Sequence, residues 1–112
     1  MCPIYTEKET EVYRRFGQGM LSLRQNANQG LGTLVENLAK EKPNHIALRH
    51  KDDSWTWQKL NEKNNRYSNF FLELGLNPGE TVSLMLENCP EYLFSTTGIN
   101  KIQGVCALIN FN

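Results

Sequence analysis

The sequence predicts an α/β fold, and two features of its second half carry that prediction. Short aliphatic runs alternate with amphipathic helical patterns from residue 33 onward. The last three segments, Thr81–Leu86, a helix that begins at Pro90 and Val105–Ile109, have the lengths of two parallel strands joined by a crossover helix. A short hairpin pattern and flanking helices accompany them. Because two parallel strands leave sheet edges unpaired, we expect an incomplete piece of a larger sheet.

The first segment, residues 1–29, is predicted to be a partly helical extension. Four apolar residues recur there at helical spacing: Val12, Phe16, Met20 and Leu23. Such a stripe usually faces a core, which favours packing on the domain or on a partner. Three arginines lie around it, and they leave an interfacial membrane helix as the alternative: Arg14, Arg15 and Arg24.

A second helix is predicted after residues 25–32, which have the composition of a linker. Thr33 and Glu36 have the spacing of a capping box, in which two side chains satisfy two backbone N–H groups at a helix start. Pro43 is expected to end the helix, since proline disfavours a helical residue before it. The predicted buried face consists of Leu34, Val35, Leu38 and Ala39.

A hairpin and a long helix follow. The hairpin strands are predicted at Ile46–Arg49 and Ser54–Trp57, with residues 51–53 as the turn. Thr56 could instead cap the next helix, from Gln58 to Leu74. Gly75 is well placed to stop that helix in a left-handed conformation. The apolar side of the helix is predicted from Leu60, Tyr67, Phe71 and Leu74.

The closing strand–helix–strand unit has its own signals. Thr81–Leu86 is aliphatic without clean alternation, which predicts a strand covered on both faces. Pro90 suits the first helical position because its missing N–H would have no partner there. Glu91 is favoured at the positive end of the helix dipole. We expect the helix to end near Ile102.

Composition excludes several classes of protein. Twelve basic and twelve acidic residues give a net charge of zero, whereas a nucleic-acid binder should carry a basic excess. No apolar run is long enough to span a bilayer. The cysteines are odd in number and widely spaced, which predicts neither disulfides nor a metal site but a reducing, cytoplasmic compartment: Cys2, Cys89 and Cys106. Peripheral membrane contact through residues 1–29 stays open.

A search for catalytic patterns yields no catalytic residue. Cys89, at a helix N-terminus, could be an activated nucleophile, but no base is identifiable and a small cap residue is the plainer interpretation. Asp52 and Asp53 are adjacent in a turn and are expected to point apart. The candidate ligand-binding residues are Asn110 and Asn112, just past the carboxyl end of a parallel strand, where open α/β sheets bind ligands. The alternative for both is a turn capped by asparagine side chains.

Residues 32–112 carry several motifs in a fixed order. The first is a Thr-Trp pair before a helix with Asn-Arg, at Thr56-Trp57 and Asn65-Arg66. The second is Gly-x-x-x-Gly-Glu-x-Val, at Gly75, Gly79, Glu80 and Val82. The third is Asn-x-Pro-Glu-Tyr, at Asn88, Pro90, Glu91 and Tyr92. In this order and spacing they resemble the N-terminal part of the AMP-forming acyl-CoA synthetases, the adenylate-forming superfamily. The closing Ala107–Asn110 resembles the branch of long- and very-long-chain fatty acid transport proteins.

The chain also departs from that family's pattern. Gln103 stands where a glycine usually ends the crossover helix, with Gly104 one place late. Thr96 and Thr97 replace bulkier apolar residues of that branch, and Phe111 replaces a common threonine. Lys59 stands where an acidic residue commonly completes the cap begun by Thr56; these departures weaken the assignment of the helix face and of the branch.

The resemblance implies a function for a longer parent protein. Family members activate a carboxylate with ATP and Mg²⁺ to an acyl-adenylate and then transfer the acyl group to coenzyme A. Their phosphate loop and catalytic lysine lie later in the chain, so residues 30–112 would be a truncated start of the adenylation domain, inactive alone. Its partners would be the remainder of its own enzyme chain and, in the whole enzyme, a fatty acid; the separate piece should self-associate. The alternative is a stand-alone interaction module, or a membrane-surface protein, made from a truncated reading frame.

Overall fold

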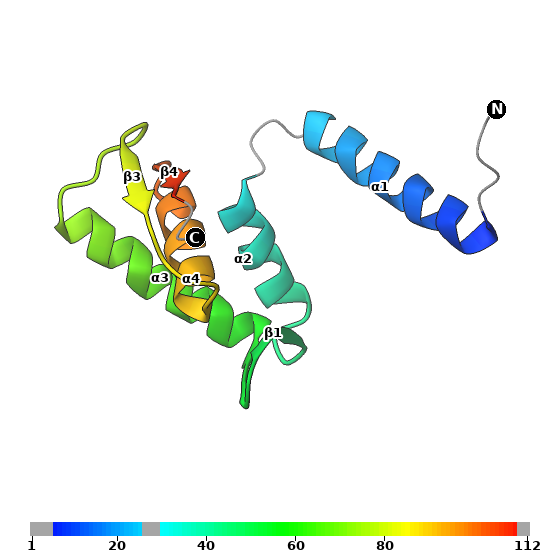
Figure 1. The fold of residues 1–112 in the computed structure, drawn as a ribbon, viewed down its shortest axis with the longest axis horizontal. Helices are drawn as coiled ribbons and strands as arrows, with labels where there is room; N and C mark the ends of the chain where they lie inside the picture. The colour runs from blue at the N-terminus through cyan, green and yellow to red at the C-terminus, as the bar shows by residue number, and fades with distance from the viewer. Residues whose placement is uncertain (1–5, 26–29, 110–112) are drawn as a thin grey trace.

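The computed structural model describes residues 6–25 and 30–109, and Figure 1 gives the course of the chain. The elements in chain order are α1 Glu7–Gln25, α2 Leu31–Glu41, β1 Ile46–His50, β2 Asp53–Thr56, α3 Trp57–Glu73, β3 Thr81–Leu84, α4 Pro90–Lys101 and β4 Val105–Leu108. This order is the predicted α/β layout of a hairpin and a strand–helix–strand unit between helices.

The two predicted strand pairs are both confirmed. β1 and β2 pair antiparallel, with Arg49 opposite Ser54. β3 and β4 pair parallel, with Val82 opposite Cys106, and α4 is the crossover between them. The ladder extends beyond the strand bounds, because the Ile109 N–H donates to the Leu84 carbonyl at 2.9 Å.

The core lies where α2, α3, α4 and the hairpin meet. Its buried centre is formed by Val35 of α2, Leu60 of α3 and Phe94 of α4. The Phe94 ring meets the Trp55 ring edge to face, with centroids 5.6 Å apart. Burial of these apolar side chains is what stabilises the helices against one another. Figure 1 shows the hairpin at one end of this group and the β3–β4 pair at the other.

Most of the predicted helix ends are confirmed. Thr56 caps α3, since its Oγ1 accepts the Lys59 N–H at 3.2 Å. Gly75 has φ +88°, the left-handed conformation that glycine adopts without steric cost. Pro90 occupies the first helical position of α4. Because Thr56 is the cap, Trp57 belongs to α3 and not to the hairpin strand.

The predicted start of α2 is wrong. The helix begins at Leu31, inside the predicted linker, and its N-cap is Gly30 with no side-chain cap. Thr33 lies within the helix instead of before it. The reason is a tertiary contact: the Gly32 N–H donates to Asn100 Oδ1 at 3.0 Å, so α4 supplies the partner that the capping box was expected to supply.

The predicted burial of β3 on both faces is also wrong. β3 ends at Leu84, its one buried residue, and Thr81 and Ser83 are exposed. Two residues of the predicted helix faces, Leu34 and Leu74, are more than half exposed. Some apolar residues that the helical and strand patterns predict to be buried are therefore left exposed, because no described segment packs against them.

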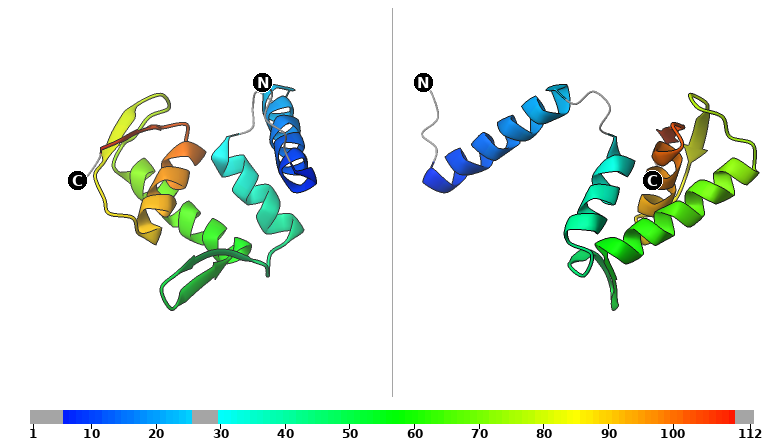
Figure 2. Two further views of the ribbon diagram at one scale, coloured as in Figure 1. Left: turned by 45° about the vertical axis from the view of Figure 1, so that its right-hand side comes forward. Right: turned by 180° about the vertical axis from the view of Figure 1, so that it is seen from behind.

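α1 stands apart from the other elements. Figure 1 and the right-hand view of Figure 2 show it extending away from α2, with the remaining elements grouped on the far side of α2. The radius of gyration is 16.7 Å, against roughly 13 Å for a compact domain of this length. The predicted packing of its apolar stripe on the domain does not occur in this arrangement.

Candidate functional site

The carboxyl ends of β3 and β4 are the place where an open parallel sheet would bind a ligand. The two predicted ligand-binding residues, Asn110 and Asn112, lie outside the described residues. The described side chains at this edge are apolar and exposed: Met85, Leu86, Leu108 and Ile109. Such an edge suits contact with further protein or an apolar group.

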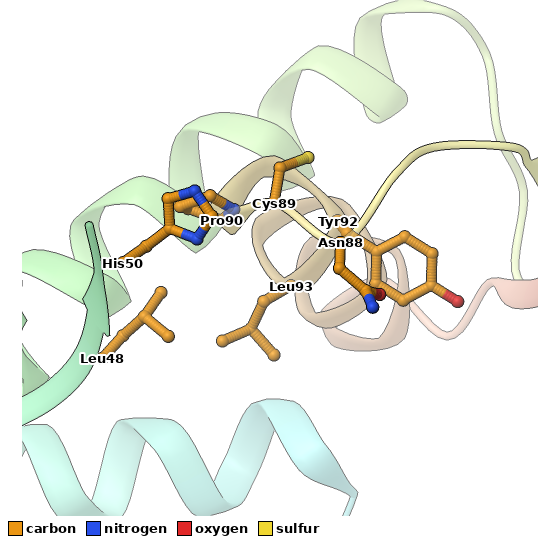
Figure 3. A pocket seen from close by; sticks show the side chains of 7 residues that line it. All are labelled: Leu48, His50, Asn88, Cys89, Pro90, Tyr92 and Leu93. Atoms are coloured by element: carbon orange, nitrogen blue, oxygen red, sulfur yellow. The ribbon is translucent and has the colours of Figure 1, made fainter.

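A pocket of about 190 Å³ lies at the start of α4, facing the hairpin. Figure 3 shows the side chains that line it: Leu48, His50, Asn88, Cys89, Pro90, Tyr92 and Leu93. Leu48 and His50 come from β1, so the antiparallel hairpin is what brings them over the helix start. Leu93 and Leu48 form an apolar side, while Asn88 and Tyr92 place an amide and a phenol at the opposite end (Figure 3).

Hydrogen bonds, burial and charges near this pocket shift the pKa values of Glu91 and Tyr67. The pKa of Glu91 is lowered, first by its own backbone N–H, next by a hydrogen bond from the Cys89 side chain, and then by the nearby His50 and Lys63. The pKa of Tyr67 is raised by burial and further by the Glu91 and Cys89 charges. The carboxylate is thus held ionised and the phenol neutral.

These groups do not form a nucleophile–base pair. The Cys89 Sγ points away from the His50 imidazole (Figure 3), so the thiol has no histidine base aimed at it. Asp52 lies in the turn of the hairpin and Asp53 is the first residue of β2, one residue short of the predicted turn; both are exposed. Among residues 6–25 and 30–109, no three His, Cys, Asp or Glu side chains gather in a way that could hold a metal ion.

A polar cluster at the end of α4, called the Lys101 joint below, connects three helices and was not predicted from the sequence. The Lys101 side chain, 7 % exposed, donates from Nζ to Glu36 Oε1 at 3.0 Å and to Asn65 Oδ1 at 2.7 Å. It also donates to Asn61 Oδ1. Glu36 belongs to α2 and the asparagines to α3, so one ammonium joins both helices to α4. The signal available in sequence was a lone lysine at a helix C-terminus, which by itself suggests only a dipole contact.

α3 and α4 touch at a small residue. A Cβ at Gly98 would lie 2.9 Å from the Tyr67 Cβ and 3.1 Å from the Asn64 carbonyl oxygen. The Ser68 hydroxyl lies 2.8 Å from the Gly98 carbonyl oxygen and 2.9 Å from that of Asn64, and it can donate to either. In the described part of the chain, the fully buried side chains of Asn64 and Thr97 have no hydrogen-bond partner. This contact positions α4, and with it the pocket and the strand that follows.

Comparison with known proteins is consistent across sequence and structure. The family described as "AMP-binding enzyme" matches residues 35–112. The chain is 32 % identical over 96 residues to long-chain fatty acid transport protein 1 of Rattus norvegicus, which covers 82 % of this chain and 15 % of that protein. It is 34 % identical over 87 residues to crotonobetaine/carnitine–CoA ligase of Citrobacter koseri, covering 73 % of this chain and 17 % of the ligase.

A solved structure has a similar fold. The structure of the fatty acyl CoA synthetase of Mycobacterium tuberculosis superposes with a TM-score of 0.70 at 25 % identity, over 72 % of this chain and 16 % of that one. The chain therefore spans about one sixth of the length of these relatives. Within the described ranges, no helix is long and apolar enough to cross a membrane.

Proposed function

The chain belongs to the AMP-binding enzyme family, and we propose that it is the N-terminal scaffold of an AMP-forming acyl-CoA ligase. The family match over residues 35–112 carries this proposal, because it covers every described element from β1 onward and most of α2. In this proposal, residues 30–112 begin the adenylation domain and residues 1–29 form a separate extension.

The reaction we propose is the formation of an acyl-adenylate from a fatty acid and ATP, followed by transfer of the acyl group to coenzyme A. The described residues gather no metal ligands, and the sequence has no phosphate-binding loop. We therefore assign the binding of ATP, Mg²⁺ and coenzyme A to other parts of the enzyme. The role of this chain is to build the β3–α4–β4 unit onto which those parts dock.

A long-chain fatty acid is the substrate we propose. Support comes from the names of two relatives, a long-chain fatty acid transport protein and a fatty acyl CoA synthetase. The ligase of Citrobacter koseri, similar over a comparable length, is named for crotonobetaine and carnitine and not for a fatty acid, so chain length is the finer part of the proposal. Among the described residues, none lines an acyl site that would decide between them.

The proposal is tested by following the reading frame beyond the codon for Asn112 and expressing the protein that it encodes. Fatty-acid-dependent exchange of pyrophosphate into ATP is then measured with acetate, octanoate and palmitate. We expect exchange with palmitate to be the fastest, and none from the 112-residue chain alone. A whole-frame protein that exchanges with none of these acids would overturn the ligase proposal, and one that prefers acetate would overturn only the long-chain part.

A second candidate is a stand-alone interaction module, which the exposed apolar surface of α1 and β4 favours. A stop codon directly after Asn112 would support this candidate. In that case the 112-residue chain should be found in cell extract as a stable complex with one partner. A ligase-active protein that contains this sequence excludes it.

A further inference from the structure

The apolar stripe of α1 is exposed along the middle of the helix. Val12, Phe16 and Met20, each four residues apart, lie along one side and are 59 %, 68 % and 53 % exposed. Tyr13 and Leu21 add two more large side chains that are more than half exposed. An exposed stripe of large apolar side chains on a protein surface is typical of a surface that binds something.

The placement of α1 leaves this stripe without cover from the described domain. Figures 1 and 2 show α1 extending away from the group of α2, α3, α4 and the strands. Gly17 and Gly19 lie in the middle of the helix with open space around them. Each glycine costs a helix about 1 kcal/mol relative to alanine, so a helix with two of them needs an external surface to hold it.

The charges on α1 fit an anionic surface. The acidic residues are confined to its first turns, at Glu7, Glu9 and Glu11, and residues 12–25 contain three arginines and no acidic residue. Arg14 and Arg15 both donate to Glu11, at 2.7 and 2.8 Å. The side chains of Arg14 and Arg15 are 55 % and 76 % exposed and that of Glu11 is 41 % exposed, so these ion pairs contribute little. The Arg15 guanidinium can exchange the carboxylate for a phosphate.

A lipid surface fits these features better than a protein groove. A groove selects a defined set of anchors and a well-formed helix, whereas a lipid surface accepts an irregular stripe flanked by arginines. The helix is about 28 Å long at 1.5 Å per residue, which is long enough to lie flat on a membrane. Its seven charged residues exclude a spanning position.

We propose that α1 binds the surface of an anionic membrane. The helix lies parallel to the surface, with Val12, Phe16 and Met20 among the acyl chains and Arg15, three residues after Val12, beside them at the lipid phosphates. The described domain then lies on the water side of the membrane. This proposal does not depend on the ligase reaction, because it concerns only the side chains of α1.

The test is flotation of the full 112-residue chain with vesicles of phosphatidylcholine alone, or with three-tenths phosphatidylserine. We expect binding to the anionic vesicles and at least tenfold less to the neutral ones. Phe16→Asp should abolish binding, whereas the matched change Phe70→Asp, at an exposed phenylalanine of α3, should leave it unchanged. Arg15→Gln should weaken binding about fivefold, whereas Arg14→Gln, on the opposite side of the helix, should change it little.

Hydrogen exchange gives a second readout that is independent of flotation. Amides of residues 7–25 should exchange more slowly in the presence of anionic vesicles, and those of α3 should not change. Equal binding to neutral and anionic vesicles would overturn the proposed role of Arg15. If the chain bound neither kind of vesicle, and if it self-associated in a way that Phe16→Asp abolishes, the membrane proposal would be overturned. The stripe would then bind a second copy of the chain. Each outcome leaves the pyrophosphate-exchange result unaffected.

Discussion

Gln103 carries a backbone conformation that suits glycine. Its φ is +64°, in the left-handed region, at the position where the family usually has glycine. Replacement by glycine removes the steric cost, so Gln103→Gly should stabilise the chain by about 0.5–1 kcal/mol in urea unfolding. The neighbouring Gly104→Ala should destabilise it, because the new Cβ would lie 2.7 Å from Ile99 Cγ2. A destabilising Gln103→Gly would contradict this account.

The Cys106 thiol has a raised pKa because burial disfavours the thiolate. Its Sγ also donates to the Thr96 carbonyl at 3.8 Å. With Cys2 and Cys89 replaced by serine, iodoacetamide at pH 8 should therefore alkylate the folded chain more slowly than the urea-unfolded chain. The thiol loses its proton less readily in the folded chain than in the unfolded chain. Its contribution to the free energy of unfolding is therefore fully present below the ordinary pKa of 9.0 and is lost as the pH rises above that value. Equal rates in both states would show that burial has no effect on this thiol.

Single residues also show how far sequence reasoning reaches. Thr56 and Gly75 were predictable because a cap and a left-handed stop depend on neighbours in the chain. Thr33 was not, because the partner that replaces its cap, Asn100, lies 67 residues away. Local hydrogen bonds can be inferred from spacing, whereas a tertiary partner for the same N–H group leaves no local pattern.

At the scale of elements, the contact between α3 and α4 depends on a glycine. Gly98→Ala places a Cβ within 3.1 Å of two backbone atoms of α3, so the helices must separate. We expect a loss of about 1–3 kcal/mol, despite the better helix propensity of alanine. Gly17→Ala in α1 is the matched control, because it meets nothing within 4 Å and should raise helix content in circular dichroism. A neutral Gly98→Ala would mean that α3 and α4 pack less closely than described.

The Lys101 joint should matter more than any surface ion pair. Lys101→Ala removes an almost fully buried ammonium from three acceptors, and we expect a loss of about 2–4 kcal/mol in urea unfolding. Glu36→Gln should cost less than about 1 kcal/mol, because Glu36 is 47 % exposed and the amide oxygen still accepts. If both variants lost the same amount, the carboxylate charge and not the whole joint would be responsible.

At the scale of the whole molecule, the β3–β4 pair leaves its edges and much apolar surface uncovered. Exposed on or beside it are Met85, Leu86, Val105, Leu108 and Ile109. We expect the 112-residue chain to self-associate, with a sedimentation coefficient that rises between low and high micromolar concentration. Val105→Lys, a charge on an edge strand, should reduce the effect. A concentration-independent monomer would count against an unfinished sheet.

The fold class and the strand order of the whole molecule were predictable, because parallel pairing follows from the length of the segment between β3 and β4. The burial of that pair was not. An aliphatic strand such as β3 indicates a covered position, but the sequence of residues 81–86 does not say which segment covers it. For the same reason the pocket at the start of α4 was not foreseen, since Leu48 and His50 reach it from a hairpin 40 residues earlier.

The joint between α2 and α4 also bears on how the chain is made. α2 is synthesised about 65 residues before Lys101, the residue that holds its Glu36. At a ribosomal rate of roughly 5–20 residues per second, the helix waits about 3–13 s for that partner. During this interval its apolar face is open to chaperones and to other nascent chains. Contacts between α2 and α3, such as that of Val35 with Leu60, involve segments made earlier, whereas the contact between Glu36 and Lys101 forms only after α4 has been made.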